Sequence, residues 1–241
     1  MKVLHAPSSP GGMGGVLAEA QRQLGTKAWS VDANTGQYDF WGDQVFDATS
    51  LVERAIAWAR FVLTNAPRFD VFHFYFGYSL LGPGLWDVPW LKRMGKRVVF
   101  HFCGCDVRDA KAIIARYPFS ACHQCWPFRC SRNRPRATEM ARRYCDAIFV
   151  STPDLLEFVP SAELVPQPID LERFDGMLAD RDLSTPPGRP GVDRPVRVAH
   201  APSDRGIKGT DRLEEAIESL RAGGRQVELV LVEKMAHADA L

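Results

Sequence analysis

The segment KVLHAPSSPGGMGGVLAEAQRQL, residues 2–24, decides the fold of this chain. Residues 2–6 (KVLHA) predict a short buried strand, and the PSSPGGMGG that follows predicts a glycine-rich turn. The next residues place apolar side chains at helical spacing, namely Val16, Leu17, Ala20 and Leu24. A strand, a glycine-rich turn and a helix in this order are typical of a parallel sheet covered by helices.

The same alternation continues to about residue 165 and predicts an α/β fold. Further strands are predicted at 28–33, 70–74, 96–102 and 146–152, and helices at 50–64, 85–94, 136–145 and from Pro153 onward. Ser50 and Glu53 are suited to cap the helix 50–64, and the helix 85–94 is expected to be interrupted near Pro89. The strand centres are apolar on both faces, as in a sheet buried between two helical layers.

The segment 176–195 interrupts this pattern with prolines and glycines and predicts a linker. A second strand–helix–strand unit follows at 196–201, 210–222 and 227–233, shortly before the chain ends at Leu241. We therefore expect two Rossmann-like lobes with parallel sheets flanked by helices. The first spans 1–175 with a cysteine-rich insertion near 103–135. The second, 196–241, is incomplete, because one such unit cannot bury both faces of its sheet. Either this unit packs against the first lobe or, as we favour, the chain is a fragment of a longer protein.

The composition is that of a globular protein, with 46% hydrophobic and 24% charged residues. This excludes general disorder, and the net charge of +1 argues against a general binder of polyanions. The sequence lacks the ~18 uninterrupted apolar residues that a transmembrane helix requires. The opening MKVLHAPSSPGG also lacks the features of a signal peptide. A cytoplasmic location is the expectation.

Two turns are suited to bind an anion. Gly11, Gly12, Gly14 and Gly15 allow backbone N–H groups to approach a ligand at the start of a helix. The turn HAPSDRGIKGT, 200–210, carries Arg205 and Lys208 before another helix. The alternatives are a flexible strand-to-helix turn in the first case and a solvated basic turn in the second.

The order of these features resembles a GT-B fold glycosyltransferase of the retaining family 4 type. The resemblance rests on the glycine-rich first turn and on the R-x-x-K-G motif that opens the second unit. The segments DVFHFYFGYS (70–79), VVFHFCGCDVR (98–108) and VPQPIDLERF (165–174) also resemble segments of that family. The family resemblance implies transfer of a sugar, with retention, from a UDP- or GDP-sugar to a small-molecule, saccharide or lipid-linked acceptor. It also implies that Gly14 and Gly15 approach the donor diphosphate, and that Arg205 and Lys208 bind it from the other lobe.

The sequence departs from the family pattern at two places. The two donor-binding glutamates of the family would lie beyond Leu241, and Glu233 ends a strand too early to be one of them. Cys103 stands where the family has its histidine before Gly-x-Asp. His101 lies two residues upstream on the same strand face, and His73 is a second candidate. His101 and Asp106 are therefore the candidate catalytic residues, Asp106 with an alternative role as a cap.

The cysteines suggest a structural zinc site. Cys122 and Cys125 form a C-x2-C knuckle, and Cys130 follows closely. A fourth ligand would come from Cys103, Cys105 or Cys145, and the alternative is a loop packed by free cysteines.

Residues 108–143 carry nine Lys or Arg against Asp109 and Glu139. This excess indicates a solvated basic face or the binding of an anionic acceptor. Two alternative functions stay open, a nucleotide- or phosphosugar-binding fragment without turnover and, less favoured, a zinc-stapled protein that binds nucleic acid.

Overall fold

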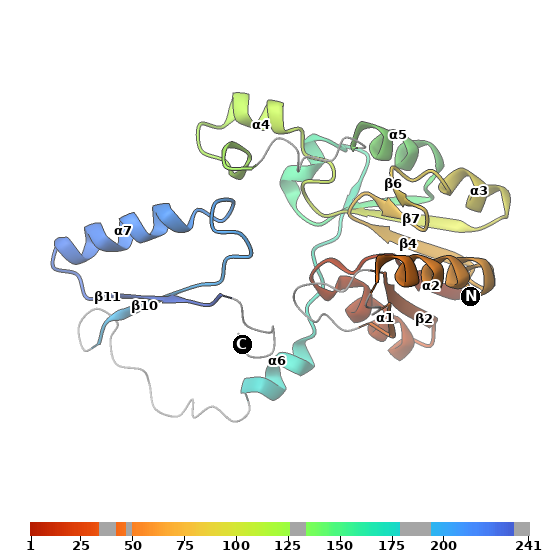
Figure 1. Cartoon of the computed structure of the whole chain (residues 1–241), viewed down its shortest axis with the longest axis horizontal. Coiled ribbons are helices and arrows are strands. Elements are labelled where there is room, and N and C mark those ends of the chain that lie inside the picture. Colours follow the sequence, from red (N-terminus) through yellow and green to blue (C-terminus); the bar gives the residue numbers. More distant parts are fainter. Residues whose placement is uncertain (34–41, 47–49, 126–133, 179–193, 234–241) are drawn as a thin grey trace. The chain divides into compact units, whose positions relative to one another are not determined.

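A computed structural model describes residues 1–33, 42–46, 50–125, 134–178 and 194–233 (Figure 1). The chain divides into two units. Unit 1 comprises residues 1–109 and 130–170, and unit 2 comprises residues 110–129 and 171–241. Residues 110–129 belong to the segment expected as a cysteine-rich insertion in the first lobe, and they group with unit 2.

Unit 1 is built on a seven-stranded sheet with the order β3-β2-β1-β4-β7-β8-β9, and every pair in it is parallel. The strands are β1 (Lys2–His5), β2 (Lys27–Asp32), β3 (Gln44–Val45), β4 (Val71–Tyr75), β7 (Arg97–Phe102), β8 (Ala147–Val150) and β9 (Glu163–Leu164). The strand order reverses its direction between β1 and β4, which is the topological switch point of a Rossmann-like sheet. The predicted α/β class is confirmed.

Short helices connect these strands. They are α1 (Met13–Gln23), α2 (Leu51–Thr64), α3 (Val88–Arg93) and α5 (Arg134–Tyr144), with 3-10 turns at Pro10–Gly12, Ala66–Arg68 and Pro153–Glu157. Ser50 caps α2 as predicted, because its hydroxyl accepts a hydrogen bond of 3.1 Å from the Glu53 N–H. The expected interruption at Pro89 is wrong. The helix begins at Val88, so Pro89 lies in its first turn, where a missing N–H costs little.

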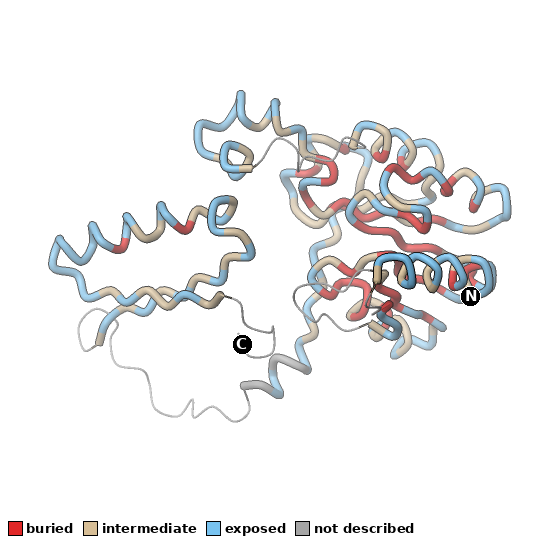
Figure 2. The backbone as a smooth tube through the Cα atoms, viewed as in Figure 1, coloured by how far each residue is buried: buried red, intermediate tan, exposed pale blue. Residues whose placement is uncertain are grey.

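The two faces of the sheet differ in chemistry. One face packs aromatic and aliphatic side chains of β1, β4 and β7 against α2, α3 and α5, including Leu4, Phe72, Phe74, Phe100 and Phe102. On the other face α1 packs on β1 and β2 through Ala18, next to Val3 and Ala28. Figure 2 shows the buried residues concentrated in these strands. The strands therefore alternate between an aromatic core and a face that also carries polar side chains.

Several short elements have no counterpart in the sequence prediction. They are β3, β9, the antiparallel pair β5 (Tyr78–Ser79) and β6 (Gly82–Pro83), α4 (Ala110–Arg116) and α6 (Leu171–Leu178). Two-residue strands leave no periodic signal, because periodicity needs at least four residues to be visible. The described part of 176–195 begins with the end of α6.

Unit 2 contains the parallel pair β10 (Val196–His200) and β11 (Val227–Leu231), connected by α7 (Thr210–Ala222). This strand–helix–strand unit matches its prediction. Its most buried side chains are Thr210 and Ile217, and the Thr210 hydroxyl lies 2.9 Å from His200 Nε2. The arrangement of two Rossmann-like lobes, the second incomplete, stays a prediction.

Across the described ranges, no helix has both the length and the apolar character needed to cross a membrane.

Candidate functional site

The turn after β1 lies at the carboxyl end of the sheet, beside the switch point. Gly11 and Gly12 adopt left-handed backbone angles, φ 59° and 77°, which glycine accommodates without a steric penalty. The Ser9 hydroxyl accepts a 3.0 Å hydrogen bond from the Gly14 N–H, so Ser9 satisfies one of the first N–H groups of α1. The glycines thus shape a sharp entry into the helix.

Gly14 also allows close packing between α1 and the sheet. A Cβ at this position would lie 2.9 Å from Ser30 Oγ, 3.1 Å from Ser9 Oγ and 3.3 Å from His5 Cβ. Gly14 and Gly15 are both buried. The observed contact of Gly14 is with the sheet, and the predicted approach of Gly14 and Gly15 to a diphosphate stays a prediction.

The segment after β9 returns to this glycine turn. The Gln167 side-chain amide lies on Gly11, with its Nε2 donating to the Gly11 carbonyl at 3.5 Å. A Cβ on Gly11 would lie 2.0 Å from that nitrogen. Two segments 156 residues apart, both quoted for the family resemblance, therefore meet at one edge of unit 1.

A group of aromatic polar side chains crosses the sheet below this edge. His5, His73, Tyr75 and His101 come from β1, β4 and β7, and the register pairs His5 with His73 and Tyr75 with His101. The centroid of the His73 ring lies 5.1 Å from that of His5, 4.4 Å from that of Tyr75 and 5.9 Å from that of His101. We call these four residues the histidine stack.

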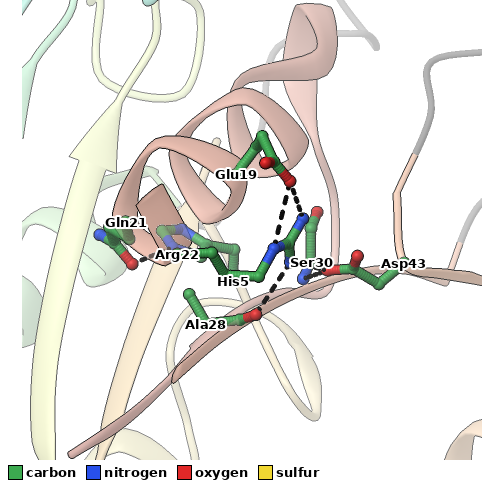
Figure 3. Close-up of polar contacts among 7 residues, drawn as sticks. All are labelled: His5, Glu19, Gln21, Arg22, Ala28, Ser30 and Asp43. Carbon is green, nitrogen blue, oxygen red and sulfur yellow. Dashed lines mark hydrogen bonds and ion pairs between the residues drawn. The ribbon is translucent and has the colours of Figure 1, made fainter. Parts of the chain in front are cut away.

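One end of the histidine stack is fully hydrogen-bonded. His5 Nε2 lies 3.1 Å from Gln21 Oε1, and His5 Nδ1 lies 2.6 Å from the Tyr75 hydroxyl. Because the Gln21 oxygen can only accept, His5 Nε2 carries the proton and Nδ1 accepts from the Tyr75 O–H. His5 is therefore a neutral imidazole with both nitrogens satisfied (Figure 3 shows its bond to Gln21).

The other end of the stack has unsatisfied nitrogens. His101 is fully buried, and among the described residues neither of its ring nitrogens has a partner at good hydrogen-bonding geometry, although the Val165 backbone acts on it in the direction that raises its pKa. His73 Nε2 is likewise buried with no partner among the described residues. Unsatisfied buried nitrogens are costly, so the predicted catalytic His101 lies in a site that would gain free energy from a polar ligand atom or a water molecule.

Burial changes the acid–base behaviour of the stack. Desolvation lowers the pKa of His5 and of His101 to about 4, with the backbone of Val165 acting in the opposite direction on His101. Desolvation also lowers the pKa of His73 well below its usual range, and the neighbouring His5 and His101 add to this shift. The pKa of Tyr75 is raised well above its usual range by burial. The histidines are thus neutral at pH 7.

The predicted catalytic Asp106 organises the turn after β7. Its carboxylate accepts hydrogen bonds from the Cys103 N–H at 3.1 Å and from the Gly104 N–H at 2.7 Å. Burial raises its pKa to about 6, and these backbone hydrogen bonds oppose the rise. The observed contacts are those of a cap on the turn, and a catalytic role for Asp106 stays a prediction.

Three turns pack together at this edge. Cys103 Sγ lies 3.9 Å from Met13 Sδ at the start of α1, and a Cβ on Gly77 would lie 3.5 Å from Asp106 Cβ. Phe76 has a left-handed φ of 54°, which is rare for an aromatic residue, and its N–H donates to the His101 carbonyl. The edge at the ends of β1, β4 and β7 therefore carries closely packed turns and a residue with a strained backbone, as functional sites often do.

Arg22, in the last turn of α1, braces this helix against β2. Its guanidinium donates to Glu19, to Asp43 at 2.8 Å and to the Ala28 carbonyl at 2.9 Å (Figure 3). Asp43 also accepts a 2.8 Å hydrogen bond from the Ser30 N–H. The network holds the helix that follows the glycine turn.

The basic turn of unit 2 has its own ion pairs. Arg205 donates to Glu214 at 2.5 Å and to both oxygens of Glu233 at 3.0 Å. Lys208 is exposed in the same turn, before the left-handed Gly209 that precedes α7. Arg205 is thus oriented by two carboxylates, and a diphosphate would have to compete with them.

Two of the three predicted zinc ligands lie among the described residues. Cys122 and Cys125 are described and half-buried, whereas Cys130 lies outside the described residues. Among the residues that are described, no three His, Cys, Asp or Glu side chains gather as a metal site. The zinc site stays a prediction.

No family model, curated protein or solved structure matches this chain. The sequence pointed to His73 and His101 separately, and it did not predict the contacts of His5 with Tyr75 and Gln21 or of Gln167 with Gly11. The signal for the histidine stack was present, because histidines at the ends of neighbouring parallel strands fall at one edge of a sheet. The contact of Gln167 leaves no such local signal.

Proposed function

We propose that this chain acts in the transfer of a sugar, with retention, from a nucleotide-sugar donor to an acceptor hydroxyl. The observation that supports this proposal is the meeting of the glycine turn with Gln167 and with the turn after β7, beside the switch point of unit 1. Rossmann-like sheets bind their ligands at this position. These are also the segments that resemble family 4 glycosyltransferases.

The reaction requires stabilisation of a departing diphosphate while the anomeric carbon gains positive character. In the proposal, Lys208 and Arg205 supply cations for the diphosphate, and Gly14 and Gly15 approach the same diphosphate from the glycine turn. His101 is neutral at pH 7, so it can share a hydrogen bond with an acceptor hydroxyl. Asp106 stabilises the turn after β7, which follows His101, by accepting hydrogen bonds from the Cys103 and Gly104 N–H groups.

The first test is calorimetric titration of the chain with UDP and GDP. Lys208→Ala is expected to weaken the binding of one of them by roughly 5- to 100-fold, the effect of losing a hydrogen bond to a charged group. Arg212→Ala is the matched control, because Arg212 is an exposed arginine of α7 that pairs with Glu215. Equal affinities in the unmodified chain, the Lys208 variant and the control would remove the diphosphate role.

The second test separates an enzyme from a binding fragment. Release of the nucleotide diphosphate from its sugar conjugate, dependent on an acceptor, is the expected activity. Binding without release supports the alternative of a nucleotide-binding module without turnover.

A further inference from the structure

Unit 1 contains a cavity of about 580 Å³ that the histidine stack and the glycine turn do not line. Its walls are α5, the end of the turn after β7 and the residue that follows the 3-10 turn Pro153–Glu157. The volume lies in the range of small-molecule sites. We call it the α5 cavity.

Arginines dominate the polar lining of the α5 cavity. Arg134, Arg142 and Arg143 come from α5, and Arg108 comes from the turn after β7. Arg134, Thr138 and Arg142 follow one another at four-residue spacing, so they share one face of the helix. The guanidinium is the side chain best matched to the oxygens of a phosphate group.

Two of these arginines are held in place. Arg108 donates through Nε and Nη2 to one oxygen of Asp154, at 2.8 and 2.7 Å. Burial raises the pKa of Asp154, but hydrogen bonds from Thr152 and then from Arg108 lower it below its usual value. Arg142 donates to the Phe158 carbonyl at 3.0 Å. A guanidinium has five N–H donors, so these bonds fix its direction and leave donors for a ligand.

The rest of the lining narrows the ligand class. Asp109 and Glu139 also line the α5 cavity, together with the Thr138 hydroxyl and the apolar Val107, Pro135 and Phe158. Four arginines stand against Asp109 and Glu139 in the lining and Asp154, which pairs with Arg108, so the excess is one positive charge. The carboxylates disfavour a polyanion, but they are good acceptors for hydroxyl groups.

From this combination we infer that the α5 cavity binds a phosphorylated sugar or polyol, with its phosphate on the arginines and its hydroxyls on Asp109 and Glu139. His101 does not line the α5 cavity, so this site is separate from the acceptor contact in the proposed function. The binding itself does not depend on that function.

The test is a titration of the full chain with hexose monophosphates and glycerol phosphate, beside glucose and inorganic phosphate. At least one phosphate ester is expected to bind at least tenfold more tightly than inorganic phosphate, and glucose is expected not to saturate. The double variant Arg134→Gln/Arg143→Gln should weaken the ester at least tenfold. Arg68→Gln is the control, because Arg68 is an exposed arginine of unit 1 outside the cavity lining, and it should change nothing.

Glu139→Ala tests the hydroxyl contacts separately. It should weaken the ester at least threefold while inorganic phosphate binds as well or better, because one negative charge has been removed. Three results would overturn the inference. They are the absence of saturable binding of any phosphate ester, equal ester affinity in the parent chain and the double variant, and an ester affinity no higher than that of inorganic phosphate. Lys208→Ala should leave the affinity for the ester unchanged. A failure of the diphosphate proposal would therefore show in the UDP and GDP titrations and not in the ester titration.

Discussion

The histidine stack makes the stability of unit 1 depend on acidity. His5 and His101 have pKa values of about 4 in the folded chain, against 6.5 for an exposed histidine. Between these values the unfolded chain binds protons that the folded chain excludes, so stability is present above pH 6.5 and is lost as the pH falls toward 4. At 1.36 kcal/mol per pKa unit, each ring accounts for about 3.4 kcal/mol over this range.

Two neighbours modify this expectation. His73 acts in the same direction, because its pKa is also lowered. Asp106 acts in the opposite direction, because its pKa is raised from 3.8 to about 6 and the folded chain binds that proton first. Near pH 5.5 unfolding therefore takes up about two protons net, a slope of about 2.7 kcal/mol per pH unit. This is a large share of the ~5–15 kcal/mol that stabilises a typical domain.

The assay is urea unfolding at half-unit steps from pH 7 to pH 5, followed by the fluorescence of the unit 1 tryptophans, such as Trp29 and Trp58. His101→Phe is the matched variant. Phenylalanine keeps a ring beside Phe149 and His73 and removes both unsatisfied nitrogens. The variant should be at least as stable as the parent at pH 7, and its slope should be smaller by about 1.4 kcal/mol per pH unit. Identical slopes in parent and variant would refute the reasoning.

Two further predictions concern packing and metal. Gly14→Ala should destabilise unit 1 by about 1–3 kcal/mol in the same unfolding assay, because the new methyl group would press on Ser30 and Ser9. Gly42→Ala is the control in the same unit, because the nearest atom there lies 3.4 Å away, and equal losses would contradict the packing role. Elemental analysis after mild purification should find zinc at more than about half an atom per chain if Cys122, Cys125 and Cys130 bind it, and a lower content would remove that site.

Local sequence patterns were enough for the larger elements of this protein. The amphipathic spacing and Ser50 determine α2, and the apolar runs around Phe72 and Phe100 determine β4 and β7. These signals work because hydrogen bonds in a helix and the alternation of a strand involve residues that are near in sequence. The same holds for β10, α7 and β11 in unit 2.

The candidate site depended on contacts that no local pattern contains. The order of the strands brings His5 beside His73, and the return of the chain after β9 brings Gln167 onto Gly11. Gly14 is a packing position because Ser30, on β2, lies where a side chain at position 14 would be. Sequence alone thus determined which of the longer elements form and approximately where they end. The tertiary structure decided which of those ends meet, because burial and hydrogen bonding between distant strands are set by topology and not by neighbours in the chain.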